Sequence, residues 1–297
     1  MTVRFRYSKK RAPLSVSVNG SHIFLYVVVI ATVLFSALPL IYMISTSLKP
    51  LDELFVFPPR FFVNNPTSEN FKTLFMAMNS SVVPFTRYLF NSIVVSGTIV
   101  FFSIMVCSLG AYGLVKHSPG GARVISLIVT SALMFSVYVT QVPNYFVVKE
   151  FGLLDSYAAL ILPKIAVAYN FFLMQQFITQ IPDTLLEAAR IDGAGELRIF
   201  FRLVMPMLKP AWATLVVFSF IANWNDYFSP LIFITDQSMK TLPLALQSIA
   251  GSIGTVDISR FGASSAASFI MTIPTITLFF LMQRMVMNTM AFSGIKG

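Results

Sequence analysis

Few residues in the chain carry side chains that catalyse reactions or bind metals. The two histidines, His22 and His117, lie far apart in the sequence, and the single cysteine, Cys107, lies within an apolar run. No cluster of histidine, cysteine or acidic residues has the spacing of metal ligands or of a catalytic site. The phosphate-binding pattern G-x-x-x-x-G-K-[ST] does not occur. We therefore expect no enzyme activity, no metal and no cofactor in this chain.

The composition indicates the kind of protein that must position any functional residues. Of the 297 residues, 56% are hydrophobic and only 11% are charged. A soluble enzyme would need far more polar surface than this, so the fold class expected is an all-α, polytopic membrane bundle in a lipid bilayer. The net charge of +9 is typical of Lys and Arg on the cytoplasmic side of such a bundle, and we expect no nucleic-acid partner.

Six uncharged or nearly uncharged runs are each long enough to cross about 30 Å of hydrocarbon as a helix. They lack the alternation of barrel strands, so helices are the natural assignment. The runs are Ile23 to Ile44, Tyr88 to Val115, Val124 to Val148, Tyr157 to about Ile178 with an interruption at Pro163-Lys164, Ala211 to Ile234, and Phe261 to Gln283.

The distribution of Lys and Arg among the loops predicts the orientation of the bundle. With the N-terminus inside, the inner segments hold thirteen of these residues and the outer segments seven. Both termini of a multi-pass membrane protein are therefore expected in the cytoplasm. The predicted domains are a basic cytoplasmic segment at 1–22, a transmembrane domain at 23–290, and a cytoplasmic tail at 291–297.

Two ionisable residues lie within the predicted spans, where a charge is costly without a partner or a water-filled path. Lys164 lies roughly 10 Å deep from the outside in the fourth span, and Asp226 lies in the outer half of the fifth. Three roles remain open for Lys164. It forms an ion pair with Asp226, it extends to the outer headgroups, or it faces a water-filled path where it could meet an anion.

Several neutral polar residues also lie within or near the spans. Their side chains could bind polar groups of a ligand, or they could form hydrogen bonds between helices. These residues are Asn91, Gln141, Asn144, Tyr145, Asn170, Asn223 and Asn225.

Two loops are longer than a simple turn requires. The outer loop, Leu48 to Arg87, includes a short amphipathic pattern at Phe71, Leu74, Phe75 and Met78. The sequence of the inner loop, at residues 180–210, predicts two short helices separated by a break. We expect the first to start with a capping box at Thr184 and Glu187 and to end at Asp192-Gly193. The second is expected to place Leu197, Phe200, Phe201 and Val204 on one face.

The inner loop resembles the EAA loop of the permease subunits of ABC importers. The matching residues are Glu187-Ala188-Ala189, Asp192-Gly193-Ala194, Phe200, Pro206 and Pro210. Further resemblance lies in Asn91-Ser92, Gly152-Leu153-Leu154-Asp155 and Leu160-Ile161-Leu162-Pro163. Asn223-Trp224-Asn225-Asp226, Pro230-Leu231, Thr241-Leu242-Pro243 and the final Gly294-Ile295-Lys296-Gly297 are similar to the carbohydrate-uptake, maltose-type branch.

This resemblance implies a mechanism and a set of partners. Glu187, Ala188, Ala189, Asp192 and Gly193 would form a coupling helix that docks on a cytoplasmic ATPase. Two such ATPase subunits would bind ATP and Mg²⁺ and switch the bundle between inward-facing and outward-facing states. A second homologous permease subunit and an extracytoplasmic sugar-binding protein complete the expected assembly. The resemblance also implies a location in the inner membrane of a bacterial-type cell.

The resemblance also bears on the substrate. An uncharged or small polar residue is more usual in the sugar branch at the position of Lys164, so its ammonium group suggests acidic, uronate-containing oligosaccharides beside neutral sugars. The candidate path comprises Lys164, Asn91, Asn144, Asn170, Asn223, Asn225 and Asp226. The competing hypothesis is a gradient-driven transporter that needs no ATPase, and it predicts internal repeats that the sequence does not show.

Overall fold

The structure, a computed structural model, describes residues 20–79, 83–251 and 259–293, and these residues are almost entirely helical. Most of the basic segment at 1–22, and the last residues of the tail at 291–297, therefore lie outside the described residues. The long elements are α1 (Gly20–Ser47), α4 (Phe85–Lys116), α12 (Lys209–Trp224) and α15 (Ser259–Ser293). Between them lie α2 (Leu51–Leu54), α3 (Glu69–Asn79), α5 (Ala122–Ala132), α6 (Val137–Glu150), α7 (Tyr157–Ile165), α8 (Ala168–Thr179), α9 (Asp183–Ile191), α10 (Glu196–Ile199), a π-helical turn η1 (Phe200–Val204), α11 (Met205–Met207), α13 (Phe228–Phe233), a 3₁₀ turn η2 (Gln237–Met239) and α14 (Leu242–Gly251).

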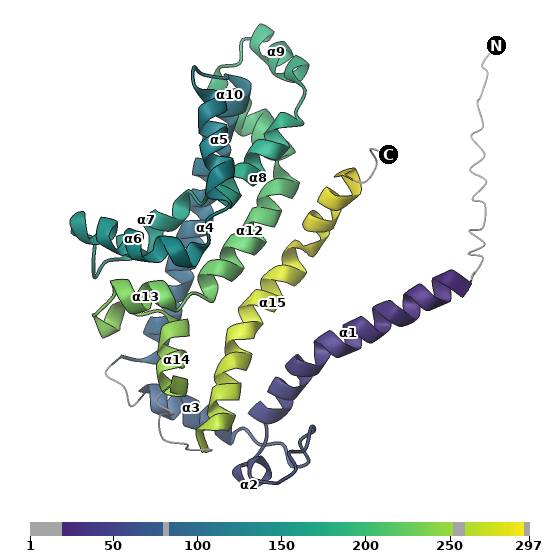
Figure 1. Cartoon of the computed structure of the whole chain (residues 1–297), viewed down its shortest axis with the longest axis vertical. Coiled ribbons are helices and arrows are strands. Elements are labelled where there is room, and N and C mark those ends of the chain that lie inside the picture. The colour runs from purple at the N-terminus through teal and green to yellow at the C-terminus, as the bar shows by residue number, and fades with distance from the viewer. Residues whose placement is uncertain (1–19, 80–82, 252–258, 294–297) are drawn as a thin grey trace, which may run out of the picture.

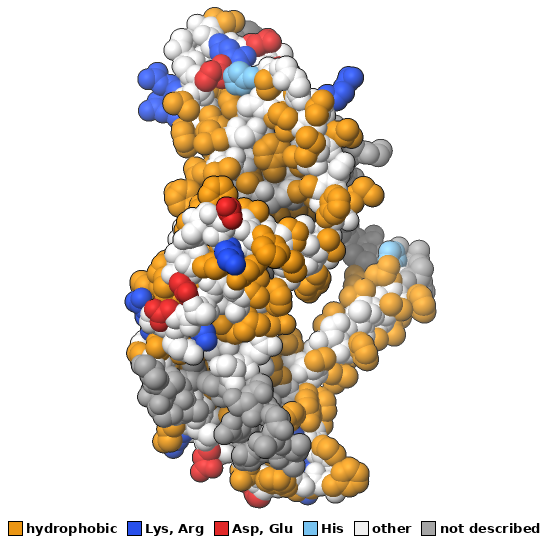
Figure 2. Space-filling view, turned by 60° about the vertical axis from the view of Figure 1, so that its left-hand side comes forward, with side chains coloured by type: hydrophobic (Ala, Val, Ile, Leu, Met, Phe, Trp, Pro, Cys, Tyr) orange, Lys and Arg blue, Asp and Glu red, His pale blue; other side chains and the backbone are white. Residues whose placement is uncertain are grey.

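The helical bundle expected from the sequence is confirmed. Four helical segments are long and apolar enough to cross a membrane, at His22–Ser47, Phe85–Lys116, Tyr157–Thr179 and Phe261–Met287. Two bent helix pairs bring the number to six if each pair forms one span. Hydrophobic side chains cover much of the flanks of the molecule, and charged ones gather at its upper end (Figure 2).

The third predicted span is not one straight helix. Helices α5 and α6 meet at residues 133–136 with an angle of 112° between them. The expectation of a continuous helix from Val124 to Val148 was therefore wrong. Neither proline nor glycine occurs at the bend, and Pro143 lies further along, inside α6. The hydropathy of a run shows that it is apolar enough to cross a membrane, but it does not show whether the helix is straight or bent.

The fifth predicted span is also divided, because α12 ends at Trp224 and α13 begins only at Phe228. In a continuous helix the Pro230 ring would clash with the carbonyl group of Asp226. Instead, the Asp226 carboxylate accepts hydrogen bonds from the backbone N–H groups of Phe228 and Ser229, at 3.1 and 3.2 Å. Asp226 thus caps the new helix rather than lying within a long one.

The fourth span is interrupted, as predicted, but the interruption lies at residues 166–167 and not at Pro163-Lys164. Helix α7 contains Pro163 and ends at Ile165, and α8 starts at Ala168. The break leaves the Ile165 carbonyl group without a helical partner, and the Cys107 thiol lies 3.7 Å from that oxygen. At both breaks, side chains therefore lie within hydrogen-bonding reach of backbone groups that have left the helix.

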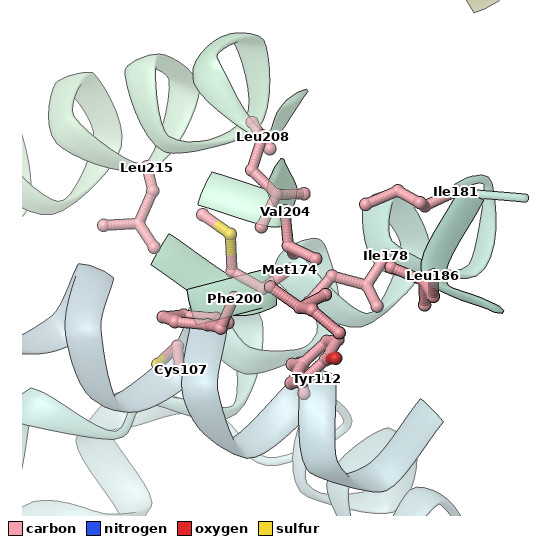
Figure 3. Packing of buried hydrophobic residues seen from close by; sticks show 13 residues of the cluster. Cys107, Tyr112, Met174, Ile178, Ile181, Leu186, Phe200, Val204, Leu208 and Leu215 are labelled. Carbon is pink, nitrogen blue, oxygen red and sulfur yellow. The ribbon is translucent and has the colours of Figure 1, made fainter. Parts of the chain in front are cut away.

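Helix α4 is the central element of the bundle (Figure 1). It packs against α7, α8, α12 and α14, and it contributes to all three clusters of buried apolar side chains. One cluster joins α4 to α8, α9 and α12 through residues that include Cys107, Met174, Leu186, Phe200 and Leu215 (Figure 3). Another joins α4 to α3, α14 and α15.

Helix α1 extends away from the other helices and meets them through α15 (Figure 1). Its most apolar window has no buried residues. Near its C-terminal end, Asn70 of α3 donates hydrogen bonds to the carbonyl groups of Ser47 and Lys49, at 3.0 and 2.7 Å. A Cβ atom at Gly262 of α15 would lie only 2.2 Å from the Asn70 Oδ1 atom, so this junction requires glycine. The short amphipathic helix predicted from Phe71, Leu74, Phe75 and Met78 is confirmed as α3.

Candidate functional site

Helix α9 carries the EAA sequence and projects from one end of the bundle (Figure 1). Glu187, Ala188, Asp192 and Gly193 are exposed, and Ala189 is half-buried. Leu186 is the one fully buried side chain of the helix, and it packs into the cluster of α4 and α8 (Figure 3). The motif therefore faces outward on a helix that is anchored from behind.

The C-terminal end of α9 follows the sequence expectation. Gly193 has φ +79°, the left-handed conformation that glycine adopts without a steric penalty. Its N–H group bonds to the Arg190 carbonyl group and that of Ala194 to the Ala189 carbonyl group, both at 3.0 Å. These two bonds form a Schellman motif, which satisfies carbonyl groups that the helix end would leave unpaired.

The N-terminal end of α9 differs from the expectation. The helix begins at Asp183 after Pro182, and no side chain caps it. The predicted capping box was therefore wrong, because Thr184 is the second residue of the helix and not the residue before it. Pro182 is suited to this place since it fixes its own φ and has no N–H group to satisfy.

The second half of the loop buries a different face from the one predicted. Ile199, Phe200, Val204 and Leu208 are buried, whereas Leu197 is 69% exposed and Phe201 is 51% exposed. The reason is the π-helical turn η1, which shifts the helix phase between α10 and α11. Leu197 and the 86% exposed Ile191 thus form an apolar surface beside the EAA residues.

Charged and polar contacts fasten the loop to the last turn of α4. The Lys116 ammonium group donates to the Asp183 carboxylate at 2.8 Å and to the Ile181 carbonyl group at 2.5 Å. The Glu196 carboxylate accepts hydrogen bonds from Tyr112 at 2.8 Å and from Arg190 at 2.7 Å. The His117 imidazole lies 3.3 Å from the same carboxylate.

These contacts affect the ionisation of Glu196. The hydrogen bond from the Arg190 guanidinium group, followed by that from the Tyr112 hydroxyl, lowers the pKa of Glu196 below its ordinary value of 4.5. The carboxylate therefore stays charged at neutral pH and keeps both donors. No local sequence pattern marks Glu196, Tyr112 or Lys116 as partners, because their contacts join residues as many as 84 positions apart.

Of the alternatives for Lys164, the structure contains the ion pair with Asp226. The pair joins the last turn of α7 to the break between α12 and α13, so it links two interrupted spans. Its side chains are 23% and 17% exposed. Since an ammonium group has three donors, Lys164 can bind a further acceptor while it is paired with Asp226.

The other candidate path residues fall into two groups. Asn91 and Asn170 are buried and bonded to neighbouring elements. The Asn91 amide group donates to the carbonyl groups of Ser238 and Lys240, at 2.9 and 2.8 Å, and accepts a bond from Tyr157 at 2.7 Å. Asn170 donates to Ser103 on α4 at 2.9 Å.

The second group is more accessible. Asn225 and Asn144 are exposed, and Asn223 is half-buried. Asn223 and Asn225 donate within their own helix, to the carbonyl groups of Ser219 at 2.7 Å and Ile221 at 2.9 Å. Asn225 therefore lies at the break, where its neighbour Asp226 pairs with Lys164. Asn91 and Asn170 connect helices elsewhere in the bundle.

A multi-pass helical bundle with a projecting helix that carries the EAA sequence is typical of one class of membrane transport protein. Comparison with known proteins places the chain in the same class. Residues 73–291 match the family described as binding-protein-dependent transport system inner membrane component. The chain belongs to this family of transport permeases, of which the EAA motif and the coupling helix are typical. It is thus a multi-pass membrane protein.

Individual relatives cover almost the whole chain. The sn-glycerol-3-phosphate transport system permease protein UgpE of Yersinia enterocolitica is 34% identical, over 90% of this chain and 94% of the relative. The polygalacturonan/rhamnogalacturonan transport system permease protein YtcP of Bacillus subtilis is 29% identical, over 89% and 94%. A bacterial ABC transporter for import of the acidic polysaccharide alginate shares the fold, with a TM-score of 0.75, 24% identity, and coverage of 88% of this chain and 95% of that one.

Proposed function

We propose that the chain is a permease subunit of an ATP-driven importer of oligosaccharides, including acidic ones. The observation that carries the proposal is α9, which presents the family's EAA residues on an exposed helix anchored to the bundle by Leu186. The chain would work with a second, homologous permease, two ATPase subunits that bind ATP and Mg²⁺, and an extracytoplasmic sugar-binding protein.

The docking surface for the ATPase consists of Glu187, Ala188, Asp192 and Gly193, flanked by the apolar Ile191 and Leu197. The small Ala188 side chain lets another surface approach the helix closely, and exposed apolar side chains beside it favour a protein partner over water. With this surface in the cytoplasm, the C-terminal end of α15 lies on the same side (Figure 1). This arrangement supports the predicted cytoplasmic location of the C-terminus.

The docking proposal is tested by purification of the assembled transporter. Ala188→Glu adds a large charged side chain to the docking surface and should abolish co-purification of the ATPase subunits. Gln180→Glu places the same charge at an exposed site just before α9 and should leave assembly intact. If uptake proceeded without any ATPase, driven by a proton or sodium gradient, the chain would instead be a secondary transporter.

The proposal of an acidic substrate depends on Lys164. Two of the proteins to which the chain is similar have acidic polysaccharides in their names or titles, and Lys164 keeps donors available beside Asp226. Lys164→Met alone would leave the Asp226 carboxylate without its ion-pair partner, so damage to the fold and damage to the path would be confounded.

The double substitution Lys164→Met with Asp226→Asn separates these effects, since it removes both charges together. Uptake of a galacturonate trisaccharide and of maltotriose is measured in liposomes that contain the complete transporter. We expect the double variant to lose uptake of the acidic sugar and to retain that of the neutral one. Equal loss of both would assign the ion pair to folding, and equal retention would place Lys164 outside the path.

A further inference from the structure

Helix α9 is held against the bundle by little apolar packing. It has nine residues, and Leu186 is its one buried side chain, with the half-buried Ala189 beside it. A short helix held at one point is free to turn about that point when a partner pushes it. Any further contact with the bundle therefore decides whether its movement is passed on or dissipated.

The further contacts lie at both ends of α9, and both reach residues near the C-terminal end of α4. At the first residue of the helix, Asp183 pairs with Lys116, whose side chain is only 5% exposed. At the eighth residue, Arg190 pairs with Glu196, which also accepts the hydrogen bond of Tyr112. Tyr112 and Lys116 lie one helical turn apart on α4.

Attachment at two points has a mechanical consequence. A helix fixed at both ends to one rigid element cannot swivel, so its displacement must move that element. Helix α4 is that element, and its length of 32 residues reaches the far side of the bundle. It packs along α7 and α12, which flank the breaks at Lys164 and Asp226.

We propose that Lys116 and Glu196 form a joint that transmits the displacement of α9 to α4, with Glu196 as a positioning residue for the coupling helix. This joint rests on the proposed function, because an ATPase must supply the displacement. Glu196 does not touch the substrate or the nucleotide. Its role is to hold Arg190 of α9 and Tyr112 of α4 on one carboxylate.

The test measures movement at the far end of the joint in the assembled transporter. A cysteine is introduced by Asn225→Cys at the exposed break of the fifth span, and its maleimide labelling is followed on the peptide that contains residue 225. Native Cys107 is fully buried, so it does not compete for the label. Labelling rates are compared without nucleotide and with ATP and vanadate, and ATP hydrolysis is measured on the same samples.

In the parent we expect the nucleotide to change the labelling rate. Glu196→Gln should reduce that change by about five-fold or more, because coupling between distant sites typically begins at about that size. ATP hydrolysis and co-purification of the subunits should remain. The matched control is Glu150→Gln, an exposed acid on α6, which should behave as the parent. Arg190→Gln combined with Glu196→Gln should lose no more than Glu196→Gln alone, since both remove one contact.

Tyr112→Phe provides a second variant if Glu196→Gln does not assemble. It deletes one hydroxyl, keeps the ring in the core, and should reduce the labelling change in the same direction. A parent that responds to nucleotide, together with Glu196→Gln and Tyr112→Phe variants that respond equally, would overturn the joint alone. A parent that binds no ATPase, or whose labelling ignores nucleotide, would overturn the proposed function and the joint together.

Discussion

The two ends of α4 hold neighbouring loops by opposite means. At the N-terminal end, which the proposed orientation places outside, the buried Asn91 amide group and the buried Ser92 hydroxyl bind the segment 238–242, and Arg87 adds an exposed hydrogen bond to the Ser238 carbonyl group. At the C-terminal end, which the proposed orientation places in the cytoplasm, Lys116 and Glu196 hold the coupling loop through charged groups, and the Glu196 side chain is 46% exposed. Buried neutral groups make most of the contacts at the first end, whereas ionised side chains make them at the second.

The difference indicates which of the two loops is held more strongly to α4. Buried polar groups that lose their partners are costly, because water does not replace the lost bonds. Exposed ion pairs are worth at most about 1 kcal/mol, since water and salt compete for the same charges. We infer that the segment 238–242 is held to α4 more strongly than the coupling loop, whose charged contacts respond to salt and pH.

The largest effect is expected from removal of the outer contact. Asn91→Leu leaves the carbonyl group of Lys240 and the hydroxyl of Tyr157 without the Asn91 amide group, while Arg87 still donates to the Ser238 carbonyl group. The variant should lower stability by about 3 kcal/mol. Thermal unfolding in detergent measures this loss. Asn144→Leu, at an exposed site, is the control. Similar midpoints for both variants would show that the outer contact is not the fixed one.

A smaller effect is expected at the end of α9. Gly193→Ala forces a side chain into a left-handed backbone conformation and should cost about 1–2 kcal/mol, expressed as faster hydrogen exchange in α9. The matched control is Gly195→Ala, because Gly195 has φ −70° and open space around its Cβ position. Equal exchange in both variants would mean that the Schellman motif does not determine the stability of α9.

Acidification should weaken the cytoplasmic contact. The folded-state pKa of Glu196 is lowered by Arg190 and Tyr112, so its stabilising contribution is present above pH 4.5 and is lost as the pH falls through the lowered pKa. Exchange in α9, corrected for the intrinsic rate, should rise over that range in the native chain. In Glu196→Gln this rise should be absent, and a persistent rise would assign it to another acid.

Salt should produce the smallest effect and should separate the two ends most simply. At 1 M KCl the Debye length is about 3 Å, so the exposed Arg190–Glu196 pair is screened. Exchange in α9 should increase by an amount that corresponds to less than about 1 kcal/mol. The segment 238–242, held mainly by the buried Asn91 and Ser92, should respond less. A response of equal size there would contradict the proposed contrast between the ends.

Local patterns were enough for several features. The spans follow from runs of apolar residues, and the end of α9 follows from Gly193, whose conformational freedom is a property of one residue. The charges of Lys164 and Asp226 suggested a pair because an isolated charge is costly in lipid, and that pair is present. The buried helix α14, in contrast, lies in a loop from which no element was predicted.

The sequence by itself determined that the chain is a membrane bundle with a projecting coupling helix, because hydropathy and short motifs act over a few turns of helix. Only the tertiary structure decided where the spans bend, which face of the coupling loop is buried, and that Glu196 meets Tyr112 across 84 positions. Such contacts depend on how helices pack against one another. No run of neighbouring residues contains that information.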